Sequence, residues 1–343
     1  MTMRDWADAI GPDVQRFSGK TVLLTGAAGF LGRYFVDLFR YLNDNVLRYP
    51  VRVIAVDNYI TGAKQLKGDD DICPVWADVS FPLPVREKIH FIISAAGIAS
   101  PVFYRKYPLE TISATVNGVQ NMLNIAHKQE DLQSFVYFSS SEIYGDPDAA
   151  HIPTGEGYNG NVSCLGPRAC YDESKRLGET LVSVYHKLYG LPVKIIRPFN
   201  VIGPGMAHND KRVIPMFTYE TMRGRALPIF RDGLQTRTFC DISDAMVGFF
   251  KVLLSGRPGE AYNIGNPDNE ISMADLGRLF QTKMNAKLSF VPYPDAYPSE
   301  EPLRRCPDIY KAERDLGYRP VTSLTEAIDF FTKWAATAPE YNS

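Results

Sequence analysis

Residues 21–32 read Thr-Val-Leu-Leu-Thr-Gly-Ala-Ala-Gly-Phe-Leu-Gly, which joins a short apolar run to a glycine-rich turn. The apolar, β-branched character of Thr21–Leu24 favours a buried strand. Shortly after the third glycine, apolar residues recur with helical spacing from Phe35 to Leu42. A strand, a glycine-rich turn and a helix, in this order, form the first half of a βαβ unit, so this stretch predicts an α/β fold.

Each glycine of the turn has a role that a larger residue would spoil. Gly26 permits the tight turn, Gly29 lets the backbone approach a pyrophosphate, and Gly32 allows the helix to pack closely on the strand. The amino terminus of the helix, at Phe30 and Leu31, would then meet the phosphates. The spacing Gly-x-x-Gly-x-x-Gly is a variant of the dinucleotide-binding fingerprint, although a purely structural turn would carry the same glycines.

Asp57 stands at the end of a second apolar run, Val51–Val56, where a parallel sheet would present it to the cofactor. Its carboxylate can accept hydrogen bonds from the ribose hydroxyls of an adenosine and would repel a ribose phosphate, so NAD is favoured over NADP. The alternative interpretation is a cap for the turn at 58–62. Further cofactor contacts are expected from Asn58, Asp78, Val79 and Ala96.

Other apolar runs predict the rest of a central sheet. The candidate strands are Phe91–Ser94, Phe135–Phe138 and Val193–Ile196, with helical patterns between them around 109–129 and 172–189. Alternating strands and helices predict a Rossmann-like, doubly wound parallel sheet. We therefore expect an NAD-binding Rossmann domain over 20–200, preceded by an amphipathic N-terminal arm over 1–19.

After about residue 200, proline and glycine become frequent and the predicted elements become shorter. This change indicates a smaller C-terminal lobe, which we expect to bind the substrate. The chain is expected to return to the Rossmann domain around 238–264, so that 201–237 and 265–335 together form the lobe.

The composition argues against several classes of protein. The 343 residues are 45% hydrophobic with a net charge of −2, which is typical of one large or two closely packed domains without a bias towards nucleic acids or membrane surfaces. The most apolar stretch, Phe91–Ala99, is too short to cross a bilayer, and no signal peptide is evident. Five scattered cysteines lack metal-ligand spacing, which predicts reduced thiols, a cytoplasmic location and no bound metal.

Tyr171 and Lys175 are separated by one helical turn in the sequence Ala-Cys-Tyr-Asp-Glu-Ser-Lys. Positions i and i+4 share one face of a helix, so the lysine ammonium can lie beside the phenol and lower its pKa towards neutrality. Such a tyrosine can take a proton from a sugar hydroxyl while a nicotinamide receives the hydride. The alternative is a surface pair on an amphipathic helix. The glycine turn and Asp57 favour the redox interpretation.

Several longer motifs resemble the extended short-chain dehydrogenase/reductase family of nucleotide-sugar enzymes, and most of all its UDP-glucuronate decarboxylase branch. The resemblance extends from about Thr21 to the helix at 324–331. The segments that carry it are Asp57–Gly62, Ile98–Pro101, Ser139–Pro147, Gly166–Arg176, Phe199–Pro204, Gln235–Arg237 and Arg305–Ile309. The run Gly-Pro-Arg-Ala-Cys-Tyr-Asp-Glu, which surrounds Tyr171, is the strongest marker of the decarboxylase branch.

The resemblance implies NAD-dependent decarboxylation of UDP-glucuronate to UDP-xylose. Tyr171, held anionic by Lys175, would deprotonate the hydroxyl on carbon four, with Ser140 sharing the hydrogen bond. Transient oxidation there creates a β-keto acid, carbon dioxide leaves, and the hydride then returns, so NAD would be catalytic and stay bound.

The segment Ser139–Gly145 separates this reaction from its relatives. The 4,6-dehydratases of the family carry an aspartate where this chain has Ser141, and simple 4-epimerases usually lack the glutamate that is present here as Glu142. A 4-epimerase or a 4,6-dehydratase of the same fold remains the alternative. A non-catalytic dinucleotide sensor is a further alternative, but it would be expected to have lost Tyr171 or Lys175.

The same resemblance implies a set of substrate contacts. Glu142 would orient the sugar ring or a water near carbon five, and Arg305 would contact the substrate near its carboxylate. The alternative roles are a buried ion pair for Glu142 and a surface charge for Arg305. The other expected contacts are Ser141, Tyr104 beside the sugar, and Asn200, Arg212 and Arg237 at the diphosphate.

Some positions depart from the family pattern. A family asparagine is replaced by Thr115, and Phe230–Asp232 stand where a Tyr-Gly-Ser type stretch is usual, which leaves the nucleotide base and the sugar open. Members of the family dimerise through two helices per subunit, and the predicted helices around 109–129 and 172–189 suit that role. We therefore expect a homodimer that binds a nucleotide sugar, most simply UDP-linked, and neither nucleic acid nor a membrane.

Overall fold

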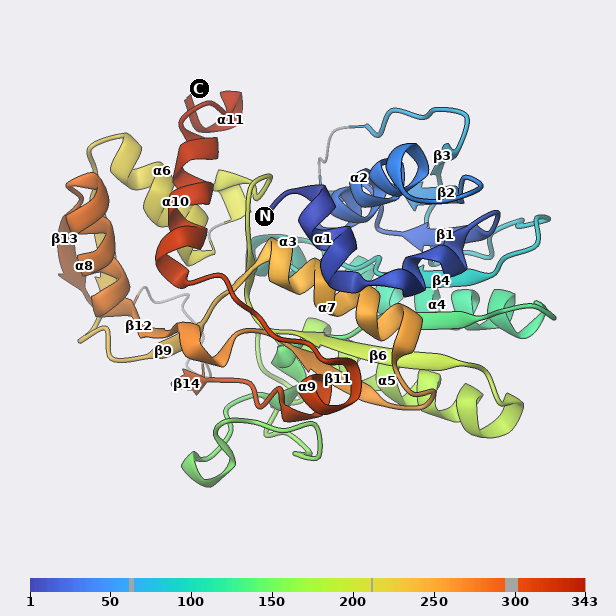
Figure 1. Ribbon diagram of the computed structural model, residues 1–343. Helices are drawn as coiled ribbons and strands as arrows, with labels where there is room; N and C mark the ends of the chain where they lie inside the picture. The colour runs from blue at the N-terminus through green and yellow to red at the C-terminus, as the bar shows by residue number, and fades with distance from the viewer. Residues whose placement is uncertain (62–64, 211, 294–301, 343) are drawn as a thin grey trace.

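A seven-stranded, fully parallel sheet forms the centre of the protein (Figure 1). The structure is a computed structural model and describes residues 1–61, 65–210, 212–293 and 302–342. In sheet order the strands are β11 (Ala261–Ile264), β6 (Val193–Pro198), β5 (Ser134–Phe138), β4 (Phe91–Ser94), β1 (Thr21–Thr25), β2 (Arg52–Asp57) and β3 (Ile72–Trp76). The predicted Rossmann-like fold is confirmed. Gly62, in the segment Asp57–Gly62, lies outside the described residues.

Helices cover both faces of this sheet because the strand residues alternate between two apolar clusters. Val22 and Leu24 point to one cluster, whereas Leu23 between them points to the other. The first face carries α1 (Met3–Ile10), α2 (Phe30–Asn45) and α7 (Ile242–Ser255). The second face carries α4 (Pro108–His127) and α5 (Ala169–Tyr189), the two helices that the sequence predicts within a few residues.

The order of the strands places a binding crevice at the carboxyl ends of β1 and β4. The chain builds outward from β1 through β2 to β3 and then returns to start β4 on the other side of β1. Connections leave in opposite directions at this switch point, which opens a crevice above the strand ends. The glycine turn follows β1 there, directly beside Ala95 and Ala96 after β4.

The smaller lobe has its own apolar cluster, and Figure 1 shows its helices grouped at one side of the sheet. Its main elements are α6 (Val213–Met222), β8 (Ala226–Phe230), α8 (Met273–Met284), β13 (Lys287–Val291) and α10 (Leu324–Ala335). A three-stranded sheet joins β12 (Glu270–Ser272), β9 (Thr236–Thr238) and β14 (Arg304–Arg305), and it pairs Arg305 with Arg237. The predicted division at 200, 238 and 264 stays a prediction. The separate apolar cluster of the lobe supports it, but Ala312, Leu316 and Tyr318, from the predicted lobe segment 265–335, pack in the cluster of the sheet.

The remaining elements are short. They are β7 (Val201–Ile202), β10 (Cys240–Asp241), α3 (Pro101–Lys106), α9 (Tyr310–Leu316), α11 (Pro339–Asn342) and the 3-10 helices η1 (Pro12–Phe17), η2 (Ser141–Tyr144), η3 (Ala149–His151), η4 (His208–Asp210) and η5 (Pro267–Asn269). Within the described residues, none of the helices has both the length and the apolarity that crossing a membrane requires.

Residues of the N-terminal arm are part of the main core. Phe17 at the end of η1 is completely buried, with its ring 5.2 Å from that of Phe39, 4.8 Å from Phe91 and 5.8 Å from Phe250. These partners come from α2, β4 and α7, so the arm joins two helices to the amino end of the central strand of the sheet. Aromatic rings of this size supply a large share of the apolar area that a core buries.

Replacing Phe17 by alanine should therefore lower the free energy of unfolding by about 4 kcal/mol, because it empties a fully enclosed site. Urea denaturation followed by tryptophan fluorescence measures this loss. Phe81→Ala is the matched control, since Phe81 is 69% exposed and its removal should leave the unfolding midpoint nearly unchanged. Equal midpoints for Phe17→Ala and the unmodified protein would show that the arm contributes nothing to the core.

Lys194 is a buried lysine far from the crevice, on β6. Its Nζ donates to Ser134 Oγ at 2.7 Å and to the carbonyl oxygen of Leu253 at 3.2 Å, near the carboxyl end of α7. A cation is favourable at that end of a helix. Burial and then the nearby charge of Arg16 nevertheless lower the pKa of Lys194 to about 8.

This lowered pKa predicts a rise in stability at alkaline pH. Between about pH 8 and the ordinary lysine pKa of about 10.5, the unfolded chain holds a proton that folded Lys194 has lost, so the free energy of unfolding increases with pH. Relative to Lys194→Met, which cannot titrate, the unmodified protein should gain about 1 kcal/mol per pH unit. Denaturation of both proteins at pH 7.5, 8.5 and 9.5 measures this gain. If the difference between their free energies of unfolding stayed constant across the three pH values, the prediction would be refuted.

Candidate active site

One large cavity of about 1480 Å³ runs from the glycine turn to the smaller lobe. Its walls include every residue that the sequence analysis assigned to the cofactor or the substrate: Gly26, Gly29, Phe30, Leu31, Gly32, Asp57, Asn58, Asp78, Val79, Ala96, Tyr104, Ser140, Ser141, Glu142, Tyr171, Lys175, Asn200, Arg212, Arg237 and Arg305. Residues from many separate segments thus meet in one space. Their individual roles stay predictions.

The glycine turn is shaped by close backbone contacts. Gly26 has a φ of +72°, and a Cβ there would lie 2.8 Å from the carbonyl oxygen of Ala95. A Cβ on Gly32 would lie only 2.1 Å from the carbonyl oxygen of Gly26. Both positions therefore require glycine, because the atoms in the way belong to the backbone and cannot rotate aside.

The amino terminus of α2 is open towards the cavity. Gly29 precedes the helix, and a Cβ there would meet only the carbonyl oxygen of Gly26, at 3.3 Å. Among the described residues, no side chain caps this helix end. Free backbone N–H groups and the helix dipole attract an anion, so the turn fits the pyrophosphate of a dinucleotide.

Asp57 is held at the edge of the same cavity by two backbone groups. Its Oδ2 accepts the N–H of Ala28 at 2.9 Å and its Oδ1 accepts the N–H of Tyr59 at 2.8 Å. Next to it, Asn58 Nδ2 donates to Asp78 Oδ2 at 3.2 Å. The carboxylate thus caps the following turn, as the alternative interpretation stated, and it also faces the cavity, where it fits the diol of an adenosine ribose.

Tyr171 and Lys175 lie one turn apart near the start of α5, and both are buried. The Tyr171 ring stacks on that of Tyr104, with centroids 5.5 Å apart and planes inclined by 16°, and its hydroxyl is hydrogen-bonded with Ser140. Lys175 Nζ donates to the carbonyl oxygen of Phe138 at 2.6 Å and lies 5.8 Å from the centre of the Tyr171 ring. The phenol is therefore fixed by stacking, by a hydroxyl and by its helix.

The expected lowering of the Tyr171 pKa by Lys175 was wrong for this structure. Burial raises the pKa of the Tyr171 phenol above its ordinary value, and this outweighs the hydrogen bond with Ser140 and the positive charges of Arg168 and Arg212, which lower it. Burial also lowers the pKa of Lys175 to about 8. Both shifts have one cause, since removing water disfavours the charged form of each group.

Glu142 forms a buried cluster of charges with two arginines. Arg305 NH2 donates to its Oε2 at 2.8 Å and NH1 binds its Oε1, while Arg168 NH2 forms an ion pair with the same Oε2. Arg168 Nε in turn lies 3.3 Å from Asp172 Oδ2. Glu142 is therefore in a buried ion pair while facing the cavity, and Arg305, which is 3% exposed, is not a surface charge.

Arg168 is a cavity residue that sequence reasoning missed. The sequence could have indicated this role, because Arg168 lies within the motif Gly166–Arg176 that carries the family resemblance. Thr115 is a second case. It is buried in α4, and a Cβ on Gly97 would lie 3.8 Å from its Oγ1 and 3.4 Å from Lys175 Nζ, so the replaced family position stands close to the lysine.

The lobe end of the cavity presents the expected cationic side chains. Arg212 directly precedes α6, and Arg237 is buried on β9. Asn200, with a φ of +33°, donates its Nδ2 to the carbonyl oxygen of Thr238 at 2.9 Å, so its amide braces the backbone there. Phe230 lines the cavity, with its ring 5.4 Å from that of Tyr293.

A turn beside the main cavity is held by two tyrosine hydroxyls, one from near each end of the chain. Tyr34 of α2 donates to the carbonyl oxygen of Pro204 at 2.8 Å, and Tyr341 of α11 donates to that of Met206 at 2.9 Å. Gly205 between them has a φ of +91° and lines the cavity. We call residues 204–206 the pinned turn.

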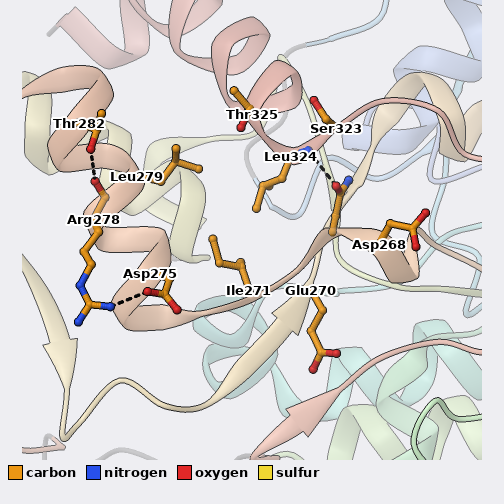
Figure 2. A pocket seen from close by; sticks show the side chains of 11 residues that line it. Asp268, Glu270, Ile271, Asp275, Arg278, Leu279, Thr282, Ser323, Leu324 and Thr325 are labelled. Atoms are coloured by element: carbon orange, nitrogen blue, oxygen red, sulfur yellow. Dashed lines mark hydrogen bonds and ion pairs between the residues drawn. The ribbon is translucent and has the colours of Figure 1, made fainter.

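A second, more open depression of about 530 Å³ lies between α8 and α10 in the smaller lobe (Figure 2). Its polar groups bind one another: Asp275 pairs with Arg278 and accepts the hydroxyl of Ser272, whose oxygen caps α8, and Asn269 Oδ1 accepts the N–H of Leu324 at 2.9 Å. Among the described residues, no group of three or more His, Cys, Asp or Glu side chains is arranged to hold a metal ion. The predicted lack of a metal stays a prediction.

A parallel sheet with an anion-binding glycine turn, a ribose-facing aspartate and a buried Tyr/Lys pair defines a dinucleotide-dependent enzyme of the short-chain dehydrogenase type. Residues 22–265 match the NAD dependent epimerase/dehydratase family, and the chain belongs to that family. The predicted cofactor, NAD, is thereby confirmed.

Within the family, several curated proteins that are similar to the chain are UDP-glucuronic acid decarboxylases. The chain is 37% identical over 311 residues to UDP-glucuronic acid decarboxylase 3 of Arabidopsis thaliana, covering 90% of this chain and 86% of that protein. It is 34% identical over 314 residues to UDP-glucuronic acid decarboxylase 1 of Danio rerio, and the match covers 90% of this chain and 71% of that protein. The resemblance to this branch is confirmed.

A solved structure supports the same fold. DesIV, a dTDP-glucose 4,6-dehydratase from Streptomyces venezuelae whose crystals contain NAD, superposes with a TM-score of 0.80 at 26% identity, covering 92% of this chain and 97% of that one.

Proposed function

We propose that the protein decarboxylates UDP-glucuronate to UDP-xylose. The observation that carries this proposal is the buried guanidinium of Arg305, which lines the same cavity as Tyr171 and already binds a carboxylate, that of Glu142. An arginine fork suits a carboxylate, and neither a neutral hexose nor a 6-deoxy sugar would need one there. The decarboxylase relatives support the same substrate.

The residues of this chain would divide the work as follows. Tyr171 accepts the proton of the hydroxyl on carbon four and later returns it, with Ser140 sharing the hydrogen bond. Arg305 holds the carboxylate until the bond between carbons five and six breaks and carbon dioxide leaves. Bound NAD would supply reversible hydride transfer at carbon four, so that the electron pair of the broken bond has a neighbouring carbonyl to enter. A proton taken up from solvent then replaces carbon dioxide at carbon five, and NAD is unchanged overall.

The surroundings of Tyr171 favour a proton exchange that is local and reversible. Burial raises the pKa of the phenol, whereas the hydrogen bond with Ser140 and the charges of Arg168 and Arg212 favour the phenolate, the form that can accept the proton from carbon four. The buried Lys175 ammonium, 5.8 Å from the centre of the ring, adds a further positive charge nearby. Burial and the neighbouring groups therefore shift the pKa of the phenol in opposite directions, which suits a group that must both accept and return a proton.

NMR of the purified protein with UDP-glucuronate, without added NAD, tests the proposal. The expected result is a UDP-xylose signal together with release of carbon dioxide. UDP-glucose and dTDP-glucose serve as parallel substrates. A galacto epimer of UDP-glucose or of UDP-glucuronate would indicate a 4-epimerase, and a 4-keto-6-deoxy product would indicate a dehydratase. Either one in place of UDP-xylose would refute the assignment.

We also propose a cytoplasmic homodimer. Support for a dimer comes from apolar side chains that α4 and α5 leave exposed, namely Leu109 (73% exposed), Ile112 (40%), Leu177 (47%), Val184 (41%) and Leu188 (67%). Two such helices per subunit would bury these residues in a four-helix bundle. A strict monomer in sedimentation at micromolar concentration would refute it. Five cysteines without disulfides support the cytoplasmic location, which cell fractionation tests.

A further inference from the structure

Two guanidinium groups share one carboxylate in the wall of the main cavity. Arg168, 9% exposed, lies just before α5, and Arg305, 3% exposed, lies on β14. Arg305 binds both oxygens of Glu142, and Arg168 pairs with Oε2. The two arginines are 137 positions apart in the sequence, so the fold alone brings them to the same glutamate.

Stability gives no reason for this arrangement. Burying an ion costs several kcal/mol, and apolar residues of similar volume commonly replace buried ion pairs without loss of stability. Two cations at one point also repel each other unless an anion lies between them. A pair of guanidinium forks held together by an anion is, however, a preformed site for a carboxylate, because each fork can donate two parallel hydrogen bonds.

We propose that Arg168 and Arg305 together recognise the carboxylate of the substrate, and that Glu142 occupies this site as an internal counter-ion until the substrate binds. The inference rests on the proposed function, which supplies a uronate as the ligand. Arg168 then determines specificity, alongside Arg305. Glu142 competes with the substrate carboxylate for the same donors, in addition to any part that it has in turnover.

The competing role is a structural brace, in which Arg168 only ties η2 to α5 through Glu142 and Asp172. The two roles differ in what they predict for ligands. A brace affects all nucleotide sugars alike, whereas a carboxylate site affects only those with a carboxylate. UDP-glucose is the right comparison, since it carries a hydroxymethyl group where UDP-glucuronate has its carboxylate.

The test measures the dissociation constants of UDP-glucuronate and UDP-glucose by calorimetry, in a Tyr171→Phe background so that the ligand is not consumed. Arg168→Gln should raise the dissociation constant of UDP-glucuronate about tenfold and change that of UDP-glucose by less than about twofold. Glu142→Gln should have the opposite effect and lower the dissociation constant of UDP-glucuronate, because the competing anion is gone. Equal weakening of both ligands by Arg168→Gln, or weaker uronate binding by Glu142→Gln, would overturn the inference.

The chain offers a matched control. Arg197, also 9% exposed, binds Glu179 through two hydrogen bonds of 2.9 and 2.6 Å, but it does not line the cavity. Arg197→Gln should lower stability and leave the ratio of the two dissociation constants unchanged. If Arg168→Gln does not fold, Arg168→Lys keeps the charge without the fork. It should still reduce the preference for UDP-glucuronate, and an unreduced preference would overturn the inference.

The outcome for Arg168 can be separated from that for the proposed function. Turnover is measured on the otherwise unmodified protein, and selectivity on the binding variants. If UDP-xylose forms but Arg168→Gln leaves selectivity unchanged, only the carboxylate site is wrong. If no carbon dioxide is released but Arg168→Gln abolishes a preference for the uronate, only the proposed reaction is wrong.

Discussion

Replacing Tyr171 by phenylalanine should reduce the formation of UDP-xylose by about 10³-fold, the scale of a lost acid–base group. The change removes one oxygen atom. The ring that stacks on Tyr104 and fills the buried site is retained, so stability should change little. What disappears is the hydroxyl that is hydrogen-bonded with Ser140 and that would exchange a proton with carbon four.

Product formation by NMR and the absorbance of reduced nicotinamide after mixing with UDP-glucuronate measure this effect. The variant should give neither product nor a transient of reduced cofactor, because oxidation itself is blocked. Tyr262→Phe is the control. It makes the same chemical change at another buried tyrosine, whose hydroxyl bonds to Asp315 outside the cavity, and it should keep most activity. Normal turnover by Tyr171→Phe would show that another group handles the proton.

Replacing Gly32 by alanine should weaken NAD binding by about 100-fold, corresponding to about 3 kcal/mol of strain in the turn. The added Cβ would lie 2.1 Å from the carbonyl oxygen of Gly26 and 2.7 Å from the backbone of Ala27. To relieve this contact, α2 must move away from the turn, which would displace the backbone N–H groups that are expected to hold the pyrophosphate of NAD.

The NAD content of the purified protein and the affinity for added NAD measure the loss. Gly157→Ala is the matched control, because a Cβ at Gly157 meets nothing within 4 Å. It should retain NAD like the unmodified protein. Unchanged NAD affinity in Gly32→Ala would mean that the helix can shift without disturbing the phosphate site, and the assigned role of the third glycine would be wrong.

The central sheet could be predicted because most of its buried strands are largely apolar runs, a pattern typical of parallel strands that are covered on both faces. The exceptions are β11, for which only a return of the chain around 238–264 was expected, and β3, which the sequence analysis missed. Pro74 interrupts this strand and Trp76 is 76% exposed, as an edge strand allows, so no apolar run marks it. The very short strands β9 and β14 carry no periodicity either, yet they set the neighbouring positions of Arg237 and Arg305.

The members of the candidate site could be named from motifs, but their electrostatics could not. The spacing of Tyr171 and Lys175 predicts that they share a helix face, whereas the direction of the Tyr171 pKa depends on burial by segments distant in sequence. The link from Glu142 to Arg168 is likewise a tertiary contact. Sequence motifs identify chemistry residue by residue, and the balance between desolvation and charge emerges only when those residues are packed together.

The pinned turn has a consequence for how this enzyme can be recombined with its relatives. Because Tyr34 and Tyr341 hold carbonyl groups on either side of Gly205, the cofactor helix and the C-terminal helix are coupled through one short piece of backbone. A chimera that exchanges the smaller lobe to alter the sugar accepted must therefore keep both anchoring hydroxyls. The two halves of the molecule are therefore not independent modules, because both are anchored to the same turn.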